Sequence, residues 1–303
     1  MTTATVVQAD KVWKSFGRID ALQGLSLAVP EGSAYALIGA NGAGKTTAIK
    51  LLMNMLEPSR GTASVMGVDT RRLSPEILAQ IGYVSENQAL PRRLGVGDYL
   101  EYLRPFYPDW DRALETSICK RLQLPLKRRI GELSHGMRIK VALACALPYR
   151  PRLLILDEPF SGLDPLVREE FMEGLLLEAG DVTMLISSHE LGEIESLSTH
   201  VGFIDAGRML IEESMSDLGA RLREVRVTLE HPAAVPANLP KEWLQPRAFG
   251  NVLSFVDTRY SEDSLGERIR ALLGPVRHID AEPMPLRAVF TTLARAARDG
   301  AIQ

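Results

Sequence analysis

A glycine-rich loop, set between an apolar run and a helical pattern, is the feature that most constrains this chain. Residues 34–38 are mainly apolar and follow a turn, which predicts a short buried strand. Residues 39–46 then read GANGAGKT and fit the pattern G-x-x-x-x-G-K-[ST]. Behind the loop, apolar residues at helical spacing predict a helix that continues up to Pro58. Strand, glycine loop and helix in this order are the context that a phosphate-binding loop requires.

The residue types of this loop suit a bound nucleotide. Glycine lets the backbone wrap a phosphate without Cβ clashes, and the dipole of the following helix adds positive potential. Lys45 is expected to reach the β- and γ-phosphates, and Thr46 is expected to hold Mg²⁺. The candidate nucleotide-binding residues of the loop are Gly39, Asn41, Gly42, Ala43, Gly44, Lys45, Thr46 and Thr47.

Two further apolar runs end in polar residues that suit phosphate chemistry. Residues 153–159 read LLILDEP, and residues 183–190 read TMLISSHE. Buried parallel strands deliver such residues to the edge of the sheet where ligands bind. Asp157 suits the Mg²⁺ network, Glu158 is a candidate to orient or deprotonate the attacking water, and His189 is a candidate sensor of the γ-phosphate. The plainer alternatives are an acidic helix cap after a strand and a structural histidine.

Residues 132–140 read ELSHGMRIK and predict the start of another helix near Gly136. Ser134 is a good N-cap, but Met137 stands where a capping box would have glutamate or glutamine. A helix start with a hydroxyl and a glycine also suits a phosphate. The stretch by itself leaves both interpretations open.

Composition limits the class of protein further. The chain has 303 residues, 46% of them hydrophobic and 24% charged, with a net charge of −3, so no global basic field favours nucleic acid. The two cysteines, Cys119 and Cys145, fall in helical patterns and are expected to be buried. The N-terminal residues do not resemble a signal peptide, and the sequence has no apolar run long enough to span a bilayer. The expected compartment is a reducing cytoplasm.

Taken together, these motifs resemble the ATP-binding subunit of an ATP-binding cassette (ABC) transporter. The matching pieces are GANGAGKTT, LSHGM, LLILDEP, SGLD and the histidine of SSHE, and they cover roughly residues 5–218. The resemblance implies an α/β fold of the P-loop type. In it, helices flank a parallel sheet, with an N-terminal antiparallel β-subdomain and a helical subdomain at about 88–150. It also implies that Phe16 stacks on adenine and that Asp164 of SGLD is a nucleotide-binding residue.

The same resemblance implies partners. Two nucleotide-binding subunits, as a homodimer or a heterodimer, close head to tail around two ATP molecules, so Ser134 and Gly136 contact the nucleotide held by the other subunit. Hydrolysis drives a separate transmembrane permease, and the loop at residues 92–94 lies where the family contacts that permease. The expected location is cytoplasmic, on the inner face of the membrane through the permease. The layout resembles exporter-type systems for drugs, peptides or lipids.

Two motifs depart from the family pattern. The family's LSGGQ is LSHGM here, so His135 and Met137 replace glycine and glutamine. In residues 81–91, IGYVSENQALP, the family's glutamine position holds Glu86, and Gln88 comes two places later. Either Glu86 takes the role that the family's glutamine has beside the metal ion, or the loop shifts so that Gln88 takes that role.

The domain prediction is a nucleotide-binding domain at 1–219 and an accessory α+β domain at 220–303. In the accessory part, residues 224–231 alternate like an edge strand and 232–240 form a proline-rich link. Strands are predicted at 251–257 and 276–280, and helices at 263–274 and 285–300. Two other classes of protein fit the sequence less well. A soluble cassette ATPase acting on ribosomes or DNA usually has two cassettes, coiled coils or zinc sites, and a silent regulatory cassette would lack Lys45, Glu158 and His189.

Overall fold

The computed structural model describes residues 4–189, 192, 194–232, 234–236 and 238–298. Backbone contacts divide the chain into two compact units, Met1–Met209 and Leu210–Gln303. Each unit has a hydrophobic core of its own. The domain boundary at residue 219, inferred from the sequence, remains a prediction.

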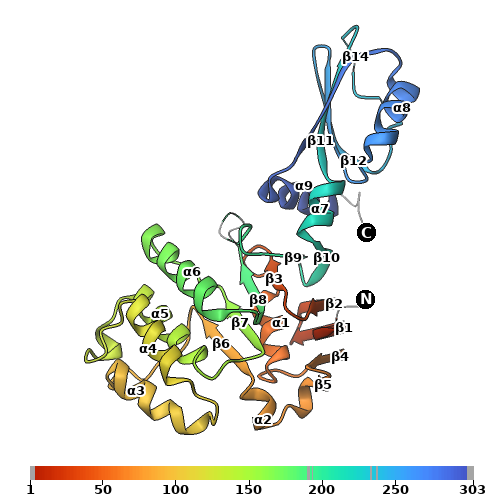
Figure 1. The fold of residues 1–303 in the computed structure, drawn as a ribbon. Coiled ribbons are helices and arrows are strands. Elements are labelled where there is room, and N and C mark those ends of the chain that lie inside the picture. Colours follow the sequence, from red (N-terminus) through yellow and green to blue (C-terminus); the bar gives the residue numbers. More distant parts are fainter. Residues whose placement is uncertain (1–3, 190–191, 193, 233, 237, 299–303) are drawn as a thin grey trace. The chain divides into compact units, whose positions relative to one another are not determined.

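A six-stranded sheet forms the centre of the first unit, and its last strand along the chain continues past Met209 (Figure 1). Its strands are β3 (Ala34–Ile38), β6 (Ile81–Ser85), β7 (Leu153–Asp157), β8 (Thr183–Ser188), β9 (His200–Asp205) and β10 (Arg208–Ser214). The order is β10-β9-β3-β8-β7-β6, with β3 parallel to β8 and β9, and β7 parallel to β6 and β8. All residues of β3, β7 and β8 are buried, which is why their sequences are mostly apolar runs rather than alternating patterns.

Helices connect the strands of this sheet. They are α1 (Lys45–Leu52), α2 (Pro75–Leu78), α3 (Val96–Leu103), α4 (Arg112–Arg121), α5 (His135–Ala146) and α6 (Pro165–Ala179). Short 3₁₀ turns are η1 (Thr70–Arg72), η2 (Arg104–Phe106) and η3 (Ile130–Glu132). The helical segments predicted between 88 and 150 are confirmed as α3, α4 and α5, and the predicted cap Ser134 begins α5. Both cysteines are free and buried, as predicted.

One predicted helix is shorter than its apolar spacing suggested. The pattern after the glycine loop predicts a helix up to Pro58, but α1 ends at Leu52. Asn54 takes a left-handed backbone conformation with φ 54°, which a right-handed helix cannot continue through. The apolar side chains beyond it still pack on the core, because Met53 and Leu56 contact the buried cluster from a turn.

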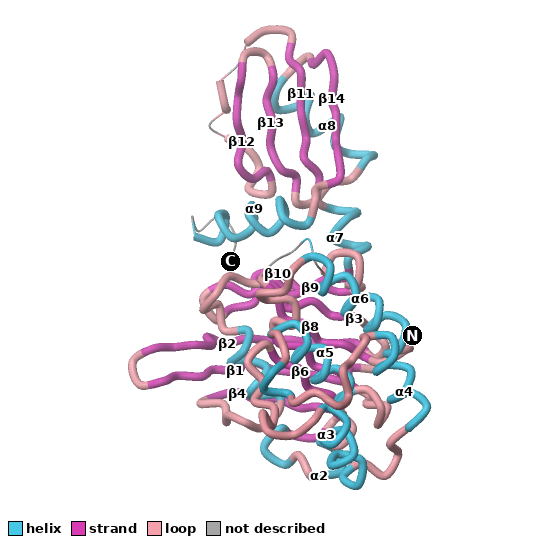
Figure 2. The backbone as a smooth tube through the Cα atoms, turned by 90° about the vertical axis from the view of Figure 1, so that its left-hand side faces the viewer, coloured by secondary structure: helices cyan, strands magenta, loops and turns pink. Residues whose placement is uncertain are grey.

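The predicted N-terminal strands form a second, antiparallel sheet in the first unit. Its strands are β1 (Thr5–Phe16), β2 (Ile19–Pro30), β4 (Arg60–Val65) and β5 (Val68–Asp69). Their order is β2-β1-β4-β5, and Figure 2 shows β1, β2 and β4 side by side. Leu22, Leu25 and Leu27 from β2 share one buried cluster with Ile49 and Leu52 of α1. This core fixes the base of the glycine loop, which leads into α1.

The second unit is a four-stranded antiparallel sheet with helices. Its strands are β11 (Arg223–Leu229), β12 (Trp243–Phe249), β13 (Val252–Asp257) and β14 (Val276–Pro283), and its helices are α7 (Met215–Arg221), α8 (Glu262–Leu273) and α9 (Leu286–Arg298). The predicted strands at 251–257 and 276–280 and both predicted helices are confirmed, except that residues 299–300 of the second helix lie outside the described residues. Val225 and Val227 pack with Phe255 and with Leu265 and Ile269 of α8.

Two details of the second unit differ from the sequence prediction. The order is β12-β13-β11-β14, so β11 is an interior strand and not the predicted edge strand. Its alternation reflects one face packed on the core and one face open, which an interior antiparallel strand shows equally well. Strand β12 was not predicted, since it contains Pro246 and has a bulge between Leu244 and Arg247. Proline is tolerated there because β12 lies at the edge of the sheet.

No helix among the described residues is both long enough and apolar enough to cross a membrane.

Candidate functional site

The glycine loop follows β3 and leads into α1, and two of its glycines are required by space. A Cβ at Gly39 would lie 2.4 Å from the carbonyl oxygen of Ile204. Gly44 has φ 110°, and a Cβ there would lie 2.7 Å from the carbonyl oxygen of Ala21. The pattern of glycines therefore lets the loop sit tightly against its neighbours while Asn41 and Gly42 remain exposed.

Lys45 is the first residue of α1 and is 5% exposed. Its ammonium donates to the carbonyl oxygens of Gly39, at 2.6 Å, and Ala40, at 3.2 Å, and lies 3.0 Å from a carboxylate oxygen of Glu158. Three acceptors thus match the three donors of the ammonium. The lysine is held over the loop by the loop's own carbonyls.

Asp157 ends β7 and is joined to Thr46 from the start of α1. The Thr46 hydroxyl donates to Oδ1 of Asp157 at 3.2 Å, and the Ser187 hydroxyl donates to the same oxygen at 2.7 Å. Burial raises the pKa of the Asp157 carboxyl above its usual value, and the hydrogen bonds from Ser187 and Thr46 oppose that shift. The two predicted metal-side groups are therefore neighbours.

Glu158 lies between the lysine and the histidine. Its Oε1 is 3.0 Å from the Lys45 ammonium, and its Oε2 is 2.7 Å from Nδ1 of His189. Its backbone has φ 52°, which is uncommon for a residue with a side chain, and its N–H bonds to Ser187. The polar ends of β3, β7 and β8, which are adjacent in the sheet, thus converge on one point.

Ser187 also belongs to the site, although no motif in the sequence indicates it. This residue lies in β8 and is fully buried. Its hydroxyl bonds to Asp157 and to the backbone N–H of Glu158, so it orients both acids. Its signal in the sequence is that two serines at 187–188 follow the apolar residues 184–186 directly before His189.

Glu86 and Gln88 follow β6 and both line a hollow of about 310 Å³ beside the acids. Glu86 donates its N–H to the carbonyl oxygen of Asp157 at 3.0 Å and accepts from the Ser161 hydroxyl at 2.9 Å. Gln88 accepts from the N–H of Ser85 at 3.4 Å. Both candidates for the metal-side role therefore lie at the hollow.

The remaining predicted site residues have structural partners of their own. Phe16 ends β1, is 48% exposed, and has the Lys14 ammonium 5.3 Å from its ring centroid. Asp164 caps α6 by accepting from the N–H of Val167 at 3.1 Å. Gly136 is buried near the start of α5, and a Cβ there would lie 2.7 Å from a methyl group of Val167. Close packing of α5 on α6 is thus sufficient to require this glycine.

Ser134 is exposed and accepts a hydrogen bond from the N–H of Met137 at 3.3 Å. Because this bond caps α5, Ser134→Ala is expected to lower the free energy of unfolding by about 1 kcal/mol. Ser134→Asn, which retains a capping oxygen, should stay close to the native value. Chemical denaturation measures both variants. Equal stability of the alanine and native proteins would show that the cap contributes nothing.

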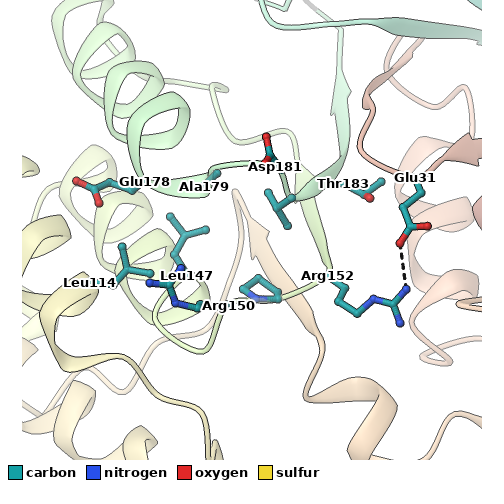
Figure 3. Close-up of a pocket in the computed structure, with 11 residues that line it drawn as sticks. Glu31, Leu114, Leu147, Arg150, Arg152, Glu178, Ala179, Asp181 and Thr183 are labelled. Atoms are coloured by element: carbon teal, nitrogen blue, oxygen red, sulfur yellow. Dashed lines mark hydrogen bonds and ion pairs between the residues drawn. The ribbon is translucent and has the colours of Figure 1, made fainter.

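A second hollow lies at the opposite edge of the same sheet (Figure 3). It measures about 270 Å³ and is lined by Arg152, which comes just before β7, and by Thr183 at the start of β8. Arg152 is paired there with Glu31 at 3.1 Å. The amino ends of the strands bound this hollow, whereas Lys45 and the acids lie at the carboxyl ends, so it is separate from the candidate site.

Comparison with known proteins decides the family. The sequence model of the ABC transporter family matches residues 22–161. Daunorubicin resistance ATP-binding protein DrrA2 of Streptomyces coeruleorubidus is 35% identical over 218 residues, which are 70% of this chain and 68% of that protein. The chain belongs to the family of ABC transporter ATP-binding proteins.

Other members of the family are similar to this ABC protein in sequence over a larger part of its length, or in structure. DrrA3 of Streptomyces coeruleorubidus, also named a daunorubicin resistance ATP-binding protein, is 31% identical over 93% of this chain and 92% of its own. Bacitracin transport ATP-binding protein BcrA of Bacillus licheniformis is 32% identical over 73% of this chain and 74% of its own. A solved ATP-binding subunit of an ABC transporter superposes with a TM-score of 0.64 at 27% identity, covering 71% of this chain and 92% of its own. The match to DrrA3 extends into the second unit.

Proposed function

We propose that this ABC protein is the ATP-binding and ATP-hydrolysing subunit of a transporter, and that it drives a separate permease of the exporter type. The observation that carries the proposal is the convergence of Lys45, Glu158 and His189 at the ends of three adjacent strands. Relatives named for daunorubicin resistance and for bacitracin transport support an exported drug or peptide as cargo. The subunit would then lie in the cytoplasm, on the inner face of the membrane through its permease.

The geometry suggests a role for each residue of the site. Backbone N–H groups of the loop and the Lys45 ammonium would bind the phosphates, which would replace the Glu158 carboxylate at Lys45. Glu158 would then accept a proton from the attacking water. His189, whose Nδ1 lies 2.7 Å from Oε2 of Glu158, would hold this carboxylate in place. The exposed ring of Phe16 would stack on adenine, as the family resemblance implies.

The residues also fit Mg²⁺. This ion takes oxygen ligands and usually binds through one or two side chains together with substrate phosphates. Thr46 and Asp157 provide a hydroxyl and a carboxylate that already lie 3.2 Å apart. When bound, Mg²⁺ would neutralise charge on the phosphates, with Glu86 or Gln88 beside it.

Two partners belong to this proposal. A second nucleotide-binding subunit would place its nucleotide against Ser134, whose hydroxyl is exposed at the start of α5. The permease would contact the loop at residues 92–94, all of which are exposed. Affinity capture from detergent-solubilised membranes should therefore carry an integral membrane protein along with this chain. Recovery of ribosomes or nucleic acid in its place would favour the other class of cassette ATPase.

Lys45→Ala tests the nucleotide site directly. Hydrogen bonds to charged groups contribute about 1.5–3 kcal/mol each, so the affinity for ATP is expected to fall by about tenfold to a hundredfold. Titration calorimetry measures this change, and Lys120→Ala, which removes an exposed lysine of α4, provides the control. Unchanged ATP affinity in Lys45→Ala would contradict the proposed site.

A further inference from the structure

The two departures from the family pattern meet at one residue. His135 and Glu86 lie far apart in the sequence, yet both are bonded to Ser161. Nε2 of His135 lies 3.2 Å from the carbonyl oxygen of Ser161, and the Ser161 hydroxyl donates to Glu86 at 2.9 Å. The first contact is a hydrogen bond when Nε2 carries the proton. The start of α5 is thus connected through Ser161 to the loop after β6.

This connection is tied to the backbone of both candidate acids. Ser161 donates its N–H to the carbonyl oxygen of Glu158 at 3.2 Å, and Glu86 donates its N–H to the carbonyl oxygen of Asp157 at 3.0 Å. A displacement of Ser161 therefore acts on the peptide groups that carry the two acids. It does so without touching the glycine loop that would bind the phosphates.

The ring of His135 also lies beside Gly162. Gly162 has φ 67°, and a Cβ there would lie 3.8–3.9 Å from ring atoms of His135 and from no other group within 4 Å. The half-buried ring thus packs beside the turn that precedes α6. The glycine that the family pattern has at position 135 has no side chain to place beside this turn or to bond to Ser161.

We infer that His135 and Glu86 are positioning residues, which act through Ser161 to hold the start of α5 in register with Asp157 and Glu158. The inference rests on the proposed function, because it concerns how that same site keeps its geometry. The charged acceptor Glu86 strengthens the bond from the Ser161 hydroxyl relative to a neutral glutamine. In this chain His135 on α5 and Glu86 after β6 thus together hold the turn at Ser161, which lies between the two acids and α6.

A double-mutant cycle on the purified chain tests the inference. His135→Phe keeps a ring beside Gly162 but removes the N–H, and Glu86→Ala removes the acceptor. Each is expected to lower kcat about tenfold and to change KM less than about twofold, since a small misplacement of catalytic groups costs rate rather than binding. The double variant should lose about tenfold in kcat, because the same connection is already broken, whereas independent effects would multiply to about a hundredfold.

Matched variants complete the test. Glu86→Gln retains an acceptor for the Ser161 hydroxyl and should recover most of the kcat lost in Glu86→Ala. Met137→Leu changes the other unusual residue near this helix start, but not the connection, and should leave kcat unchanged. Single-variant losses that multiply, or a native kcat in both His135→Phe and Glu86→Ala, would overturn the inference.

A separate readout distinguishes failure of the inference from failure of the proposed function. If the native chain hydrolyses no ATP, the proposed function fails. The connection is then measured from urea unfolding of Ser161→Ala, Glu86→Ala and their combination. The shifts in the unfolding midpoint are expected to be clearly non-additive, because both variants remove the same hydrogen bond. Additive shifts would overturn the inference.

Discussion

Glu158→Gln is expected to slow ATP hydrolysis by about 10²–10⁴-fold, which corresponds to roughly 3–5 kcal/mol of activation free energy. The amide has the size of the carboxylate and can still bond to Lys45 and His189, so the fold and the affinity for ATP should remain. It cannot accept the proton of the attacking water. Binding and hydrolysis should therefore separate, and an ATP-bound dimer should accumulate.

Two measurements check this prediction. Phosphate release gives the rate, and sedimentation with ATP and Mg²⁺ shows the dimer. Glu169→Gln makes the same chemical change at an exposed position of α6 and should behave like the native protein. A Glu158→Gln variant that hydrolyses ATP at the native rate would exclude Glu158 as the base.

Much of the first unit could be predicted because its central strands are buried on both faces. Such strands are read as continuous apolar runs, and β3, β7 and β8 were found in this way. The glycine loop adds a local constraint, since Gly39 and Gly44 are required by close contacts that leave no room for a side chain. Parallel strands that end at one edge then imply that Glu158 and His189 lie close together, and they are 2.7 Å apart.

The rest depends on tertiary contacts that local patterns do not encode. Alternation in β11 cannot distinguish an interior from an edge strand, because both bury one face. Apolar spacing beyond Leu52 continues although the backbone turns at Asn54, since a turn can bury the same side chains. The meeting of His135 and Glu86 at Ser161 likewise depends on how three separate segments fold against one another.

Ser134→Arg is expected to abolish ATP-driven dimerisation while leaving the ATP affinity of the single chain nearly intact. Ser134 is exposed at the start of α5, and a long cation there would fill the space that a partner's nucleotide needs. If Ser134 serves only as a helix cap, a different result is expected. Its replacement would cost about 1 kcal/mol of stability and would leave association unchanged.

Mixing two defective proteins makes the test sharper. Subunits with Ser134→Arg retain a sound Lys45, and subunits with Lys45→Ala retain a sound Ser134. In a mixed dimer one composite site pairs the sound Lys45 with the sound Ser134, and the other site carries both defects. If Ser134 contacts the nucleotide across the interface, the mixture should form some ATP-dependent dimer in sedimentation, although neither protein does so alone. A mixture that does not recover, together with normal dimerisation of Ser134→Arg by itself, would leave the helix cap as the only role of Ser134.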